Sequence, residues 1–160
     1  MMDELVSKLH DLCNRGEWTL SLAESCTGGL ISSAITSHSG VSEFFLGSVV
    51  SYSNSVKEDV LEVPKSMLKK SGAVSAEVAI AMAKGVQIQM KSDWSLAVTG
   101  IAGPSGGSPE KPVGTVWFAI AGPNFEVSQT QIFTGNRTEI QMRAAVHALT
   151  LLVKAMGTQG

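Results

Sequence analysis

The chain has few of the residues on which several classes of protein depend. It contains two cysteines, Cys13 and Cys26, which are too few for a disulfide framework or a zinc cluster. It has no run of 18 apolar residues, and its amino terminus is acidic where a signal peptide would be basic. Twelve basic residues against 14 acidic ones give a net charge of −2 and no basic stripe. We therefore expect a cytoplasmic protein that binds neither membrane nor nucleic acid.

Common cofactor and metal motifs are also missing. Neither Gly-x-Gly-x-x-Gly nor Gly-x-x-x-x-Gly-Lys occurs, so the usual dinucleotide and nucleotide phosphate loops are not expected. The chain has no His-x-x-x-His pair, no paired cysteines and no Asp-rich loop. The sequence thus predicts no metal and no cofactor.

The chain does contain 160 residues of ordinary globular composition, 44% of them hydrophobic, which suffices for one domain with its own core. Apolar spacing predicts helices at 2–15, about 28–38, about 55–61, a short stretch after Pro64, 76–90 and about 137–155. Strands are predicted at 18–23, 44–53, 94–100, 113–121 and 125–133, the last two joined as a hairpin. This order predicts a single α/β domain over residues 1–160, with three α/β/α layers and a mixed, mostly parallel five-stranded sheet.

A short segment, Ala23-Glu-Ser-Cys-Thr-Gly-Gly29, joins a predicted strand to a predicted helix. Ligands of α/β domains bind at such strand ends. Ser25 is a candidate nucleophile, and free N–H groups of the following helix would offer an oxyanion or phosphate pocket. Cys26, at the same helix start, is a candidate reactive thiol. The alternative is that Ser25 only caps the helix and that the two glycines only allow tight packing.

A serine nucleophile needs a base, and none of the three histidines lies near a Gly-rich turn. Tyr52 and Lys57 are the other proton carriers near a strand end. A lysine ammonium stabilises a phenolate, and burial lowers the pKa of a lysine, so either group could take the Ser25 proton. The alternative is a core tyrosine with a solvated hydroxyl and a lysine exposed on its helix.

Two later segments carry further candidates. Thr99-Gly-Ile-Ala-Gly103-Pro ends a predicted strand in small residues, which permits a ligand to approach the backbone. Ser105 lies in a Gly-x-Ser-x-Gly match, but no helix follows it and no aspartate follows to orient His147, as a nucleophile elbow requires. Arg137, at the start of the last helix, has the planar fork that binds phosphate, unless it is simply a surface arginine.

Seven motifs occur in order: Ala23-Glu-Ser-Cys-Thr-Gly-Gly29, Tyr52-Ser-Asn54, Gly72-Ala-Val-Ser75, Thr99-Gly-Ile-Ala-Gly-Pro104, Gly106-Gly-Ser108, Glu110-Lys-Pro-Val-Gly-Thr-Val-Trp117 and Gly135-Asn-Arg137. Together they resemble the CinA C-terminal domain family over about residues 5–155. The resemblance implies hydrolysis of nicotinamide mononucleotide to nicotinate mononucleotide and ammonia, a step of pyridine nucleotide salvage. It implies a catalytic set of Ser25, Tyr52 and Lys57. Substrate-binding residues are then expected at Cys26, Thr27, Gly28, Gly29, Thr99, Gly100, Gly103 and Arg137.

The resemblance leaves alternatives. Many relatives carry an additional amino-terminal nucleotide-processing domain, whereas this chain starts directly at the carboxy-terminal module, so one activity is expected. Many relatives also have a second glycine where this chain has Ser48 after Gly47. A homo-oligomer is expected, with the number of copies left open. The competing functions are a catalytically silent nucleotide-binding module and a general serine amidase or esterase that uses Ser105 and His147.

Overall fold

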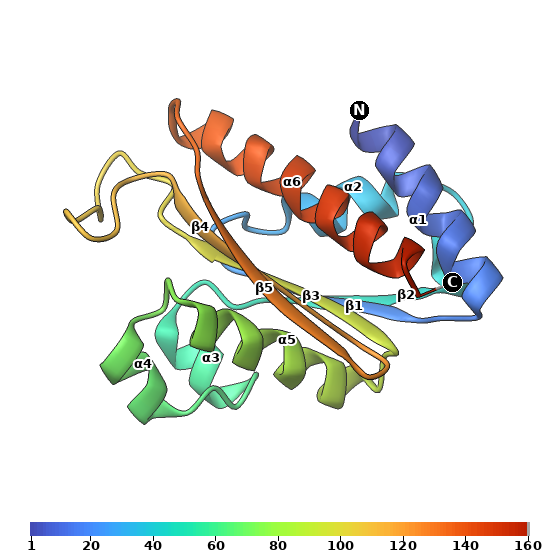
Figure 1. The fold of residues 1–160 in the computed structure, drawn as a ribbon, viewed down its shortest axis with the longest axis horizontal. Coiled ribbons are helices and arrows are strands. Elements are labelled where there is room, and N and C mark those ends of the chain that lie inside the picture. Colours follow the sequence, from blue (N-terminus) through green and yellow to red (C-terminus); the bar gives the residue numbers. More distant parts are fainter. Residues whose placement is uncertain (160) are drawn as a thin grey trace.

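The computed structural model describes residues 1–159 as six α-helices, one 3₁₀ helix and five strands (Figure 1). In chain order these are α1 (Met2–Gly16), β1 (Leu20–Glu24), α2 (Leu30–Thr36), η1 (Val41–Glu43), β2 (Phe45–Val50), α3 (Asn54–Asp59), α4 (Lys65–Ser71), α5 (Ala76–Met90), β3 (Trp94–Gly100), β4 (Thr115–Gly122), β5 (Phe125–Ile132) and α6 (Arg137–Gly157). Each predicted helix and strand is confirmed, with ends that shift by a few residues. No helix among the described residues is both long and apolar enough to cross a membrane.

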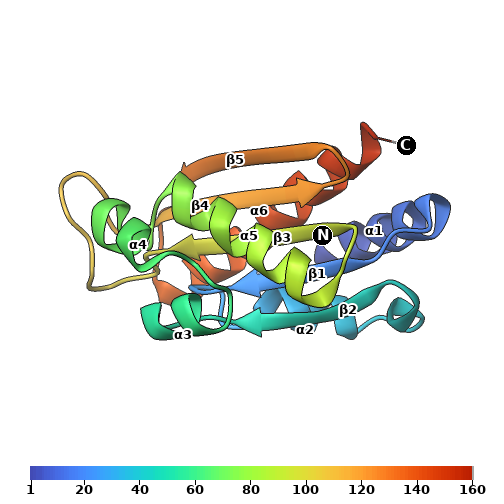
Figure 2. The same ribbon diagram turned by 90° about the horizontal axis from the view of Figure 1, so that it is seen from below.

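The five strands form one sheet in the order β2-β1-β3-β4-β5, and Figure 2 shows them side by side in this order. β1 pairs in parallel with β2 and with β3, whereas β4 is antiparallel to both β3 and β5. The predicted mixed sheet is thus confirmed. All five residues of β1 are buried, as expected for a central strand that is covered on both faces.

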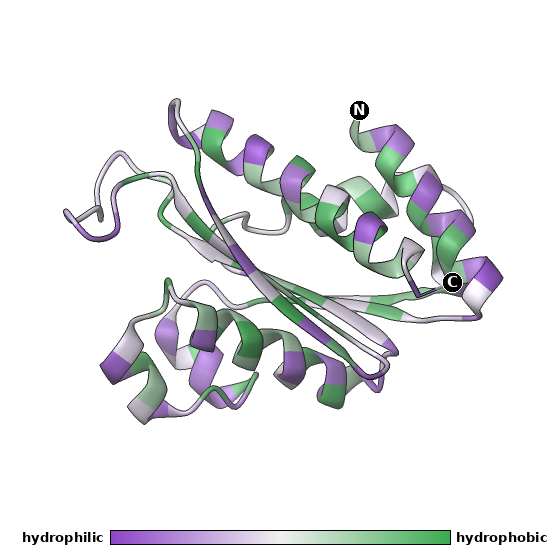
Figure 3. Cartoon of the chain, in the orientation of Figure 1, coloured by the Kyte–Doolittle hydropathy of each residue, from purple (hydrophilic) through white to green (hydrophobic). Residues whose placement is uncertain are grey.

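Helices cover both faces of the sheet, which confirms the three layers. α1, α2 and α6 lie on one face, and α3, α4 and α5 lie on the other (Figure 1). Each face has its own apolar core, one centred on α1, α2 and α6 and the other on α5. Hydrophilic and hydrophobic residues alternate along the helices because one side of each helix packs against the sheet or against another helix (Figure 3).

The helix ends follow local side-chain chemistry. Ser53 and Ser75 cap α3 and α5 by accepting hydrogen bonds from the N–H groups of Val56 and Val78. The first helix extends one residue beyond its predicted end at residue 15, so that Gly16 is the last residue of α1. Glu17 takes the left-handed cap conformation, with φ of 54°.

The topology brings three strand ends to one edge. β1, β2 and β3 run in parallel, and Glu24 pairs with both Val50 and Val98 near their carboxyl ends. The segments that follow these strands therefore meet beside Ser25. This is the edge at which open α/β sheets bind ligands.

Candidate active site

Ser25 follows the last residue of β1 and is held by the neighbouring strand. Its N–H donates to the Val98 carbonyl at 2.9 Å, so the sheet ladder extends one residue past the strand. Its Oγ lies 3.0 Å from Lys57 Nζ. Ser25 is only 7% exposed, which places the hydroxyl at the bottom of a cleft and not on the open surface.

Lys57 is the charged group nearest to Ser25, and it is almost fully buried at 1% exposure. Its Nζ donates to the carbonyls of Ser51 at 2.8 Å and Tyr52 at 3.2 Å. With these two contacts made, the third direction of Nζ faces Ser25 Oγ. In the ammonium form that position is a donor, and in the neutral amine it is the lone pair that accepts the Ser25 proton.

Burial also favours the neutral amine. Desolvation lowers the pKa of Lys57 below its ordinary value of 10.5, and this effect is larger than the opposing one of the neighbouring Cys26. No ion pair to Lys57 occurs among residues 1–159, so no carboxylate restores the charged form. The geometry and the lowered pKa both suit a general base.

Tyr52 lies differently from the arrangement expected of a lysine–phenolate pair. Lys57 contacts its backbone carbonyl, whereas its hydroxyl accepts a 2.6 Å hydrogen bond from Arg137. Successive residues of an extended segment point to opposite sides, so Ser51 is buried and Tyr52 is 57% exposed. The expectation that Lys57 holds Tyr52 as its phenolate is therefore wrong. Tyr52 forms part of the cleft mouth.

The cleft has a volume of about 220 Å³. It is lined by Ser25, Cys26, Tyr52, Asn54, Lys57, Ala73, Val74, Thr99, Gly100, Ala102 and Arg137. Seven of the predicted site residues are thus brought together. Sequence reasoning did not assign Asn54, Ala73, Val74 or Ala102 to the site, although all four belong to quoted motifs. Ala73 lies there because its carbonyl accepts a 3.0 Å hydrogen bond from Thr99 Oγ1.

Four predicted substrate-binding residues do not line the cleft, and the structure gives each another function. Thr27 Oγ1 donates to Glu24 at 2.7 Å. Gly28 and Gly29 have φ of 59° and 102°, a conformation that side chains disfavour, so the turn itself requires them. The carbonyl of Gly103 accepts a 2.7 Å hydrogen bond from Arg137.

The expected anion pocket at the start of α2 is already filled by the protein. The N–H groups of Ile31 and Ser32 donate to the Glu24 carboxylate at 3.0 and 2.9 Å. The prediction that these groups cradle a ligand is therefore wrong. Glu24 was missed, although an acidic residue at the end of a buried strand is a signal that the sequence offered.

Cys26 lines the cleft but is not a reactive thiol. Burial raises its pKa to about 12, so the thiolate is scarce near neutral pH. Its carbonyl accepts a 2.9 Å hydrogen bond from Gln141, which ties the turn to α6. In the described part of the chain, the backbone N–H groups of Cys26 and Thr27 donate to no other residue, whereas those of Ser25 and Gly28 do.

The Ser105–His147 alternative is not assembled. Ser105 lies in an exposed loop, and the two residues make no hydrogen bond. His147 packs against Phe118 and Phe133 and bonds to Gln129 at 2.9 Å, and burial lowers its pKa.

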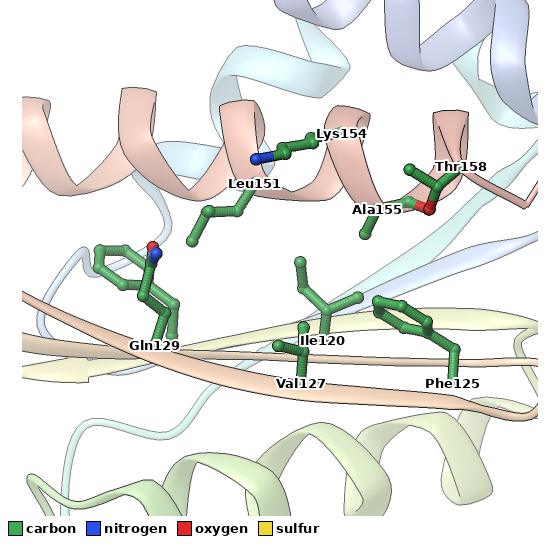
Figure 4. Close-up of a pocket in the computed structure, with 9 residues that line it drawn as sticks. Ile120, Phe125, Val127, Gln129, Leu151, Lys154, Ala155 and Thr158 are labelled. Atoms are coloured by element: carbon green, nitrogen blue, oxygen red, sulfur yellow. The ribbon is translucent and has the colours of Figure 1, made fainter.

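A second cavity, of about 290 Å³, lies between α6 and the β4–β5 hairpin. Figure 4 shows Leu151 on the helix opposite Ile120 and Val127 on the strands. The single hydroxyl among its lining residues belongs to Thr158 and donates to the Ala155 carbonyl. This cavity is mainly apolar and holds no nucleophile–base pair, so the cleft at Ser25 is the candidate active site.

Comparison with known proteins gives the family. The sequence matches the CinA C-terminal domain over residues 2–156. The chain belongs to the CinA C-terminal domain family. It is 46% identical over 155 residues to a CinA-like protein of Pseudothermotoga lettingae, and the aligned region covers 97% of this chain and 37% of the relative. It is 54% identical over 136 residues to a CinA-like protein of Geotalea daltonii, with 84% and 32% covered. The chain thus spans about a third of these curated CinA-like relatives.

Solved structures of CinA proteins share the fold. The competence/damage inducible protein CihA from Agrobacterium tumefaciens has a TM-score of 0.94 and 37% identity, with 98% of this chain and 95% of that one covered. The CinA superfamily protein KP700603 from Klebsiella pneumoniae 700603 has a TM-score of 0.94 and 30% identity, with 99% of each chain covered. These neighbours match this chain over nearly their full length.

Proposed function

We propose that this CinA-family domain is an amidohydrolase that converts nicotinamide mononucleotide to nicotinate mononucleotide and ammonia. The observation that carries the proposal is the 3.0 Å contact between Ser25 Oγ and the buried Lys57 Nζ. A hydroxyl in contact with a lysine of lowered pKa is an activated nucleophile, and an amide is a substrate that needs one. The choice of nucleotide rests on the family resemblance and on Arg137 at the cleft mouth.

The reaction proceeds in two halves. Neutral Lys57 takes the Ser25 proton while Oγ attacks the carboxamide carbon, and the resulting tetrahedral intermediate carries a negative oxygen. Lys57 then returns the proton to the departing nitrogen, which leaves as ammonia, and an ester joins Ser25 to the nicotinoyl group. Water attacks this ester with Lys57 again as base, and the carboxylate product leaves with Ser25 restored.

The surrounding groups suit the charges that develop. The N–H groups of Cys26 and Thr27, which donate to no other described residue, are the candidate donors to the oxyanion. Arg137 uses two of its five N–H donors within the protein, one for Gly103 and one for Tyr52, and three remain for a phosphate. The exposed ring of Tyr52 lies beside it, where a ribose or pyridinium ring would enter.

The test is ammonia release from nicotinamide mononucleotide by the purified protein, measured beside Ser25→Ala and with a chelator present. We expect turnover by the wild type and a loss of about 10⁴-fold or more in the variant, because removing the nucleophile abolishes the covalent path. Ser105→Ala is the matched control and should keep full activity. Calorimetric binding of the nucleotide without ammonia release would instead identify a silent nucleotide-binding module. Loss of activity in Ser105→Ala would point to the esterase alternative.

A further inference from the structure

Glu24 is a fully buried carboxylate, with 0% exposure, at the end of the central strand and directly before Ser25. A buried carboxylate is costly unless it is paired with a cation or fully hydrogen bonded. Among the described residues it forms no ion pair. All the hydrogen bonds to its side chain come from the turn and helix that follow Ser25.

Four donors fill the two carboxylate oxygens. Oε1 accepts from Thr27 Oγ1 at 2.7 Å and from the Ile31 N–H at 3.0 Å. Oε2 accepts from the Ser32 N–H at 2.9 Å and from Ser32 Oγ at 2.5 Å. The side chain thus caps α2 from the preceding strand, and it fixes both ends of the turn that carries Ser25.

The main chain of Glu24 is also linked to Lys57, through two hydrogen bonds of Ser51. Its carbonyl accepts the Ser51 N–H at 2.7 Å, and the Ser51 carbonyl in turn accepts Lys57 Nζ at 2.8 Å. One residue therefore holds the turn with the nucleophile through its side chain and the segment that binds the base through its backbone.

We propose that Glu24 is the positioning residue of the active site, and this inference rests on the proposed amidohydrolase function. Its carboxylate holds residues 25–32 so that Ser25 Oγ faces Lys57 Nζ. It also occupies the N–H groups of Ile31 and Ser32 in the first turn of α2, so the Cys26 and Thr27 N–H groups are the candidate donors near the nucleophile. Without the carboxylate, the turn loses four hydrogen bonds, and a displacement of about 1 Å at a nucleophile costs about 10²-fold in rate.

Glu24→Gln tests this positioning because it keeps the shape of the side chain but replaces one acceptor oxygen by an NH₂ group. This NH₂ group is a donor and cannot accept the hydrogen bond from the Ser32 N–H. We expect kcat to fall about 10²-fold with KM within threefold. Labelling of Ser25 by a fluorophosphonate should slow by the same factor. Ser21→Ala is the matched control, because it removes a buried 2.6 Å hydrogen bond to Ser92 at the other end of the same strand. A merely structural function for Glu24 would lower the melting temperature of both variants and leave their kcat and labelling rates at the wild-type values.

Ser32→Ala is the second variant, for use where Glu24→Gln does not fold. It removes a single donor to the carboxylate, and we expect a smaller loss, about tenfold, in both kcat and labelling rate. Wild-type rates in whichever of the two variants folds would overturn the positioning inference. Wild-type protein that is labelled but releases no ammonia would overturn the nucleotide as substrate, and the labelling rates would still decide the inference about Glu24. Wild-type protein that is neither labelled nor active would overturn both proposals.

Discussion

Replacing Lys57 by methionine removes the amine while keeping a long, unbranched side chain in a position that is 1% exposed. The variant loses the 3.0 Å contact to Ser25 Oγ, and among residues 1–159 no other side-chain nitrogen forms a hydrogen bond with this oxygen. General base catalysis contributes about 10²- to 10⁴-fold to a rate. We therefore expect kcat to fall by this factor, which corresponds to about 2.7–5.4 kcal/mol of transition-state stabilisation.

The assay is ammonia release as a function of pH. Only the neutral amine accepts a proton, so the wild-type kcat should rise with pH and level off above the pKa of Lys57. Because burial lowers this pKa, the inflection should lie below 10.5. Residual activity of Lys57→Met should lack this inflection.

The matched control is Lys84→Met, which makes the same chemical change at an exposed lysine that pairs with Glu126 on the surface. Its kcat and pH profile should match the wild type. A Lys57→Met variant with more than a tenth of the wild-type kcat, or with an unchanged pH profile, would refute the assignment of Lys57 as the base.

Three further changes separate other contributions. Tyr52→Phe removes the hydrogen bond to Arg137 but no contact with the nucleophile. KM should therefore rise less than tenfold, and kcat should stay within threefold of the wild-type value. A decrease of about 10²-fold in kcat would instead identify Tyr52 as the base. Arg137→Lys replaces the planar fork that donates to both Tyr52 and Gly103 by a single ammonium group with fewer donors. KM for the nucleotide should therefore rise about tenfold while KM for nicotinamide riboside changes less, and equal effects on both would exclude a phosphate contact. Gly85→Ala raises the helix propensity of α5 by about 1 kcal/mol, but the added methyl group overlaps the Leu61 main-chain carbonyl at a cost of about 3 kcal/mol. Calorimetry should therefore show a melting temperature lower by about 4–8 °C. An increase would contradict the packing described.

The fold was predictable because its elements carry strong local signals. α5 and β3 were predicted with the bounds that the structure shows, since Ser75 caps the helix and apolar residues fill the strand. The hairpin of β4 and β5 was predictable because only the three residues Gly122-Pro123-Asn124 separate the two predicted strands. Sequence periodicity reports which residues face a core, and the core of this domain is continuous on each face of the sheet.

The residues of the site were predictable only in part, and their contacts were not. Ser25, Lys57 and Arg137 lie together as expected, but the partner of each was not apparent from the sequence. Whether the tyrosine hydroxyl or its backbone carbonyl meets Lys57 depends on which way residue 52 points as the chain leaves β2, and a motif does not record this. The function of Glu24 was hidden for a related reason, because its hydrogen bonds reach residues up to eight positions later.

The hairpin turn at Pro123 and Asn124 lies at the end of the sheet opposite Ser25. In the antiparallel pairing of β3 with β4, Ser95 is opposite Ala121 and Gly100 is opposite Val116, so the turn projects beyond the start of β3. The length of a strand, about 20 Å, separates it from the cleft, and both turn residues are exposed. The turn is therefore a suitable site for inserting an affinity tag, a fluorophore or a surface-attachment peptide. An insertion between these two residues would leave the entrance to the cleft open when the protein is immobilised.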